Sequence, residues 1–76
     1  MPDISMRLRS LFARNLRLLR YRSGFSQVEL AALAGLDRNY IGKLEREENS
    51  PTLETIEALA IALRTDPEAL LGNDFR

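Results

Sequence analysis

Cysteine and histidine are both absent from the 76-residue sequence. Without cysteine no disulfide bond can form, and without either residue type the chain has no zinc site of the usual Cys/His kind. The two absences also remove the commonest catalytic nucleophile and the commonest general base. Because the carboxylates, including Asp3 and Asp37, form no paired constellation with a nucleophile or a metal site, we expect no enzymatic activity, no bound metal and no cofactor.

Long apolar runs are missing as well. The apolar stretch from Leu8 to Leu19 is interrupted by arginines, so no run of about 18 apolar residues could cross a bilayer. The N-terminus does not resemble a secretory signal. We therefore expect a cytoplasmic protein without membrane contact, forming a single domain over residues 1–76 with residues 1–5 as a flexible arm. Because these residues are all assigned to the one domain, we expect no sensor domain and no small-molecule effector.

The net charge is zero, but it is unevenly distributed along the chain. Residues 1–46 carry nine Lys/Arg and four Asp/Glu, a balance of +5, whereas residues 47–76 carry two and seven, a balance of −5. A surface that binds nucleic acid needs a local positive potential, which a zero average does not exclude. The asymmetry is compatible with DNA binding by one side of the domain, or with an ordinary solvated basic helix.

Residues 26–46, SQVELAALAGLDRNYIGKLER, predict two short helices around a tight turn. Ser26 can cap the first helix, which then begins near Gln27, and Glu29 stands where the acidic residue of a capping box reaches back. Gly35 can adopt the left-handed conformation that ends a helix.

The second of these helices follows the glycine directly. Asp37 offers an N-cap, which predicts a helix over residues 37–46 with Ile41 and Leu44 on its inner face. Two capped helices joined by a turn with glycine describe a helix-turn-helix.

Three further helices are predicted outside this stretch. Residues 6–22 form the first, before Ser23 and Gly24 break the pattern. Thr52 can cap a fourth, and Asp66 with Pro67 can open a short fifth that runs through Leu71. Their apolar residues recur at spacings of three and four: Leu8, Phe12, Leu16 and Leu19 in the first, and Leu53, Ile56, Leu59, Ala60 and Leu63 in the fourth.

The ordered set of these segments resembles a known family. It consists of LRLLRYRSGFSQVELAALAG, then LDRNYIGKLERE, then SPTLETIEALAIAL with its DPEALL tail, and it covers about residues 16–71. The set is similar to the small five-helix DNA-binding domain of Cro and phage-repressor type (XRE-family) transcription regulators. The resemblance implies an all-α, compact, repressor-like fold with a central helix-turn-helix, and double-stranded DNA as the partner.

In that family the second helix of the motif enters the major groove with its N-terminal end. By position, the resemblance assigns base reading to Arg38, Asn39 and Lys43. Arginine or lysine can donate two hydrogen bonds to guanine, and asparagine can pair with adenine.

Five further residues are implied as contacts to the DNA backbone. Three of them have a structural alternative. Gln27 can instead be an ordinary first-turn residue, and Arg46 a solvated side chain. Tyr40 can contact a phosphate or a thymine methyl, or its ring can be buried. The set is Gln27, Tyr40, Arg46, Asn49 and Ser50.

Two features concern how the reading helix is held. Arg20 and Glu45 match a family pair that forms a structural salt bridge, which we expect to be partly buried and not to contact bases. Gly42 departs from the family pattern, since relatives usually have a small residue with a side chain there. A close approach by DNA or by a neighbouring helix would explain it, as would relaxed selection.

A single reading helix covers few base pairs, so useful specificity normally requires two half-sites and a homodimer. The candidate dimer surface, with ordinary core packing as its alternative, consists of Ile61, Leu63, Pro67, Leu70, Leu71 and Phe75. We therefore predict a transcriptional regulator on a pseudo-palindromic operator, of the kind that includes restriction-modification controllers. The alternative interpretation is an antitoxin-like or adaptor module that binds protein instead of DNA.

Overall fold

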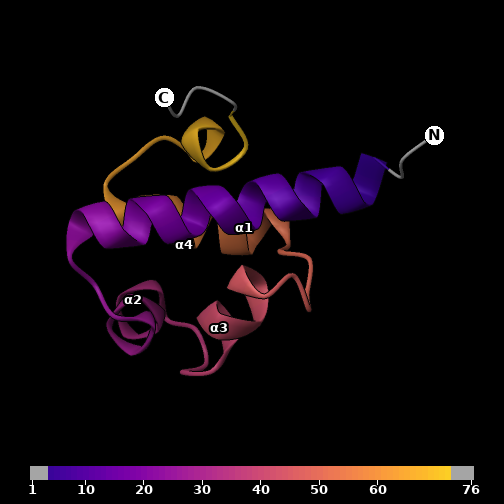
Figure 1. Cartoon of the computed structure of the whole chain (residues 1–76). Helices are drawn as coiled ribbons and strands as arrows, with labels where there is room; N and C mark the ends of the chain where they lie inside the picture. Colours follow the sequence, from indigo (N-terminus) through magenta and orange to yellow (C-terminus); the bar gives the residue numbers. More distant parts are fainter. Residues whose placement is uncertain (1–3, 73–76) are drawn as a thin grey trace.

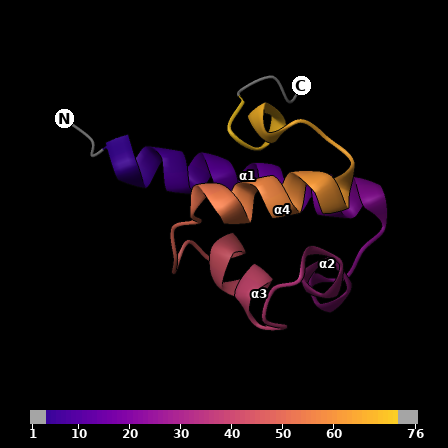
Figure 2. The same ribbon diagram turned by 180° about the vertical axis from the view of Figure 1, so that it is seen from behind.

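The computed structural model describes residues 4–72, with side chains from Arg7 onward. In this part of the chain four α-helices and one 3-10 turn are formed, and there is no strand. The long helix α1 separates the turn η1 on one side from α2 and α3 on the other (Figure 1), and α4 lies along α1 (Figure 2). The elements are α1 (Ile4–Ser23), α2 (Gln27–Ala34), α3 (Tyr40–Glu45), α4 (Leu53–Leu63) and η1 (Pro67–Leu70).

One apolar core joins all five elements. Its largest fully buried side chains are Phe12, Leu16, Leu30, Ile41, Leu44, Leu59 and Leu70. Leu8, predicted on the inner stripe of the first helix, is instead exposed because it lines an open groove, beside Ile56 and Leu71, and is not covered by another element. Among the described residues, none of the helices is long and apolar enough to span a membrane.

Asn15 fastens η1 to α1 from within the core. Its amide nitrogen donates hydrogen bonds to the carbonyl oxygens of Leu70 at 3.0 Å and Gly72 at 2.8 Å. Because an unpaired buried amide is costly, these bonds determine where the C-terminal turn docks.

Both N-caps predicted for α2 and α4 are confirmed. Ser26 accepts a hydrogen bond from the N–H of Glu29, whose carboxylate accepts one from the N–H of Ser26 in return. The hydrogen bond from the Ser26 backbone is the main cause that holds the pKa of Glu29 below its usual value, and hydrogen bonding with the Ser26 side chain adds to it. Thr52 caps α4 through the N–H of Thr55.

The four α-helices end in the same way. A residue with positive φ follows each helix, and the chain then turns back onto the last helical carbonyls. At Gly35, for example, φ is 70° and the N–H of Leu36 donates to the carbonyl oxygen of Ala31 at 2.8 Å. Two of the four positions are not glycine: Glu47 has φ 63° and Arg64 has φ 55°.

Three predicted boundaries are wrong. The fifth helix is a four-residue 3-10 turn, because few residues separate Asp66 from Gly72. The helix predicted from Asp37 begins at Tyr40, since the Asp37 carboxylate accepts from the N–H of Asn39 and so stabilises a turn. Residues 4 and 5, predicted within an arm, belong to α1, and residues 1–3 lie outside the described part.

Candidate nucleic-acid interface

The predicted base-reading residues lie at the start of α3 and just before it. Arg38 and Asn39 are exposed in the preceding turn, and Lys43 is exposed on the helix. Asn39 has helical backbone angles, and the N–H of Lys43 donates to its carbonyl oxygen at 3.4 Å. Residues four apart on a helix share a face, so the side chains of Asn39 and Lys43 emerge on the same side. Tyr40, between them, is half-buried against the core.

A buried ion pair holds the inner side of α3. Arg20 and Glu45 are only 7% and 4% exposed, more deeply buried than expected. The guanidinium of Arg20 donates from Nε to Oε2 of Glu45 at 2.7 Å and from Nη2 to Oε1 at 2.9 Å. This bonding raises the pKa of Arg20 above its ordinary value. The paired geometry fixes the rotation of α3 against α1.

Two more side chains bind Glu45. The amide nitrogen of Gln27 donates to Oε1 of Glu45 at 3.0 Å, and Nη2 of Arg17 donates to the Glu45 carbonyl oxygen at 2.9 Å. Gln27, predicted to contact a phosphate, links α2 to α3 in this structure. Arg17 was missed by sequence reasoning, although its place three residues before Arg20 puts both arginines on one face of α1.

Gly42 is explained by these neighbours. A Cβ atom at this position would lie 2.9 Å from Nη1 of Arg46 and 3.3 Å from Oε1 of Gln27. Glycine thus leaves room for the Arg46 guanidinium to lie back over α3, beside the amide of Gln27. The close approach at Gly42 is therefore made by two side chains of the protein itself, those of Arg46 and Gln27.

The loop after α3 carries the remaining predicted backbone contacts, and they are exposed. Nε of Arg46 donates to Oε2 of Glu48 at 2.6 Å. This bond raises the pKa of Arg46 and lowers that of Glu48. Ser50 accepts a hydrogen bond from Nε of Arg9 at 3.0 Å, which ties the loop to α1, and Asn49 is exposed beside it.

The predicted dimer surface is only partly at the surface. Leu63 and Leu70 are 8% and 0% exposed, so their assignment to an interface is wrong: α4 and η1 turn these two side chains into the core. Ile61 is 73% exposed, and Pro67 and Leu71 are exposed as well. Phe75 lies outside the described residues.

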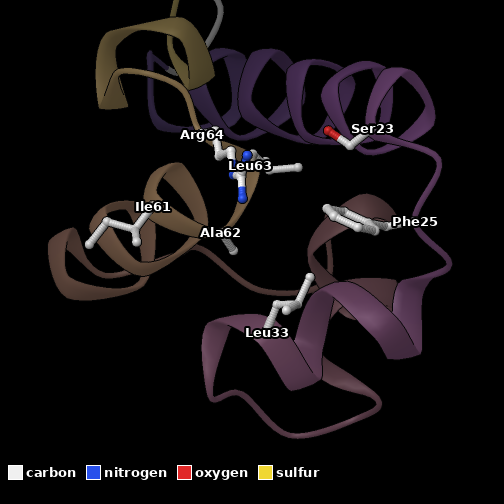
Figure 3. A pocket seen from close by; sticks show the side chains of 7 residues that line it. All are labelled: Ser23, Phe25, Leu33, Ile61, Ala62, Leu63 and Arg64. Carbon is white, nitrogen blue, oxygen red and sulfur yellow. The ribbon is translucent and has the colours of Figure 1, made fainter.

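An open groove lies between α2 and α4 next to Ile61. Phe25, Leu33 and Ala62 face this gap and Ile61 stands at its outer rim (Figure 3). Leu33 is 59% exposed and was not singled out from the sequence, since its spacing alone also fits a core position. Leu33 of α2 and Ile61 of α4 are thus exposed apolar side chains at the borders of one groove, with Ile61 pointing away from Leu33 (Figure 3). The residues lining the groove are Ser23, Phe25, Leu33, Ile61, Ala62, Leu63 and Arg64.

The chain is similar to known proteins over the segments described above. Residues 16–70 match the family model HTH_3, described as helix-turn-helix. The control protein C.SmaI of Serratia marcescens is 42% identical over 74 residues, which are 93% of this chain and 88% of that protein.

Two solved structures share the fold. The hypothetical transcription factor NHTF from Neisseria has a TM-score of 0.85 and 42% identity, covering 95% of this chain and 82% of that one. The restriction-modification controller protein C.AhdI from Aeromonas hydrophila has a TM-score of 0.79 and 44% identity, covering 82% of this chain and 94% of that one.

Proposed function

The chain belongs to the helix-turn-helix family HTH_3, and we propose that it is a sequence-specific DNA-binding transcriptional regulator that acts as a homodimer on a pseudo-palindromic operator. The observation that carries this proposal is the arrangement of α3. Its inner side is held by the Arg20–Glu45 pair, while Asn39 and Lys43 are exposed on one face and Arg38 is exposed in the turn just before the helix. A rigidly held helix with free donors is what direct reading of the major groove requires.

Base reading falls to the three exposed donors. Arg38 and Lys43 can each donate to guanine O6 and N7, and the Asn39 amide can pair with adenine. Contacts to the DNA backbone are assigned to residues on α3 and on the segments before and after it. These are Gln27 at the N-terminus of α2, Tyr40 on α3, and Arg46, Asn49 and Ser50 in the loop after α3. Helix N-termini and side-chain donors of this kind bind phosphate oxygens and set the register on the duplex.

The groove between α2 and α4 supports the dimer. Ile61 and Leu33 are large apolar side chains exposed at its rim, on the surface that a second copy would cover in a symmetric contact. Two copies related by a twofold axis would then present two reading helices to successive major grooves about one helical turn apart.

A controller role in restriction-modification is the most specific form of the proposal. It is supported by C.SmaI and C.AhdI, whose names describe control and controller proteins and which this chain matches over most of its length. A regulatory rather than enzymatic role is consistent with both names.

Selection from a pool of random duplexes with the purified protein tests the proposal. A pseudo-palindromic consensus bound by two copies is the expected result. Arg38→Ala and Lys43→Ala should each weaken binding to that consensus by about 1–3 kcal/mol and relax specificity at one position per half-site.

Arg14→Ala is the matched control for these variants. Its guanidinium donates to Oδ1 of Asn15 at 3.4 Å, and the Asn15 amide donates to the carbonyl oxygen of Leu70 in η1, which lies across α1 from α3 (Figure 1). If the base-reading variants bind no more weakly than this control, or no duplex is enriched, the interpretation as a protein-binding module replaces the present one.

A further inference from the structure

Two carboxylates occupy the loop that follows α3, where a DNA-binding surface would be expected to carry only positive or neutral groups. The carboxylate of Glu47, which is exposed, accepts a hydrogen bond from the hydroxyl of Ser10 on α1. Glu48 instead faces Arg46, one of the residues proposed to contact the DNA backbone.

The backbone fixes where Glu48 stands. The N–H of Glu47 donates to the carbonyl oxygen of Leu44 at 3.1 Å, and the N–H of Glu48 donates to that of Lys43 at 2.9 Å. These two bonds close the C-terminus of α3, with Glu47 in the left-handed conformation. Glu48 is thus held at the end of the reading helix rather than on a loose loop.

The guanidinium of Arg46 lies between Glu48 and α3. Its Nε binds the Glu48 carboxylate at 2.6 Å, while its Nη1 lies over Gly42 and close to the side chain of Gln27. A carboxylate and a phosphate use the same donors of a guanidinium. Glu48 therefore takes up one of the donors of Arg46 that a DNA phosphate could bind.

We propose that Glu48 is an internal competitor of DNA phosphate for Arg46, and that it lowers the affinity of the protein for DNA of any sequence. The proposal rests on the function proposed above. Because the Arg46–Glu48 pair is exposed, it contributes little to folding and can be exchanged for a phosphate at small cost. The Glu48 charge nevertheless remains beside the bound strand and repels it.

The charge of Lys43 reaches the same carboxylate. The hydrogen bond from Arg46 is the largest cause that lowers the pKa of Glu48, and the positive charges of Arg46 and Lys43 lower it further. Glu48 thus partly neutralises one proposed base-reading residue and one proposed backbone contact. Sequence-independent attraction is reduced by such neutralisation, whereas hydrogen bonds to specific bases are not.

Glu48→Gln tests the proposal when affinity is measured for the selected operator and for a random duplex over a range of salt concentrations. We expect affinity for the random duplex to rise about three- to tenfold at low salt, with a smaller gain as salt screens the charge. Affinity for the operator should rise by no larger factor, so that the ratio between the two falls or stays level. The thermal midpoint should stay close to that of the parent, because the lost pair is exposed.

Glu68→Gln is the matched control. It removes the same charge from an exposed residue of η1, which lies on the opposite side of α1 from α3 (Figure 1). This variant should change affinity by less than about twofold, because its charge is distant from the bound strand.

Arg46→Ala, alone and combined with Glu48→Gln, tests the competition itself. The gain from Glu48→Gln should be largely lost when Arg46 is absent. An equal gain in both backgrounds overturns competition at Arg46, as does an equal gain from Glu68→Gln or no gain at all. If the parent protein binds no duplex, the proposed function fails first and this inference fails with it.

Discussion

Arg20 on α1 donates two hydrogen bonds to the carboxylate of Glu45 at the end of α3, at 2.7 and 2.9 Å, and both side chains are buried. The helix proposed to read DNA is therefore positioned by a charge pair that is largely shielded from solvent. Removing one partner would leave the other charge buried and unpaired.

We expect Arg20→Ala to lower the free energy of unfolding by about 3–5 kcal/mol, a large share of the stability of a small domain. Arg20→Lys should recover only part of this loss, because lysine cannot bind the carboxylate through two parallel bonds. Urea denaturation followed by circular dichroism measures both. A loss for Arg20→Ala no greater than that for Arg14→Ala, on the same helix, would contradict the prediction.

Gly42 offers the opposite test, since glycine within a helix is unfavourable. Gly42→Ala should raise the free energy of unfolding, by less than about 1 kcal/mol, because alanine favours the helix and the end of Arg46 can move away. Gly42→Val should lower it, because a branched side chain would also displace Gln27 from Glu45. The same denaturation experiment compares the two variants, and stabilisation by valine would refute this account of the site.

The positive φ angles that end the helices predict opposite effects of glycine and alanine. At Arg64, with φ 55°, Arg64→Gly should stabilise the domain by about 1 kcal/mol, since glycine adopts this conformation without steric cost. At Gly35, with φ 70°, Gly35→Ala should destabilise it by a similar amount, although open space surrounds the position. Thermal unfolding of both variants gives the sign directly. If the stability of both variants changed in the same direction, the positive φ angle would not be the common cause.

The capping box predicts a dependence on pH. The pKa of Glu29 is lowered in the folded state by its bond from the Ser26 backbone, so its charged form contributes stability above the unfolded-state pKa. That contribution is lost as the pH falls through the lower, folded-state pKa. Glu29→Gln keeps an acceptor at this position but cannot titrate, so its stability should fall less steeply in acid. Unfolding measured between about pH 2 and pH 7 compares the two proteins, and parallel curves would show that Glu29 is not the cause.

If two copies associate through the groove between α2 and α4, as proposed, a charge placed in this groove should block dimerisation. Ile61→Lys places a charge on the exposed rim and should shift the protein to monomers without lowering the thermal midpoint of the monomer. Sedimentation equilibrium measures the association. Leu53→Lys is the control, because Leu53 is an exposed apolar residue at the other end of α4. Loss of dimers in the control alone would move the interface to that end.

Local structure in this chain was readable from the sequence because its signals act over a few residues. The caps at Ser26 and Thr52 and the turn at Gly35 are where the pattern predicts them, since each depends only on hydrogen bonds within one helical turn. The start of α3 was misplaced because Asp37 can stabilise either a helix or an isolated turn, and the local pattern does not distinguish the two.

Only the tertiary structure decided which side chains meet across elements. Leu63 and Ile61 stand two residues apart with similar hydrophobicity, yet one is in the core and the other on the surface, because the packing angle of α4 selects its inner face. The same packing brings Arg17 and Gln27 to Glu45 and places the side chains of Arg46 and Gln27 over Gly42. Helical period and capping residues thus specify the elements, whereas the contacts that hold α3 arise from the docking of α1, α2 and α3 onto one core.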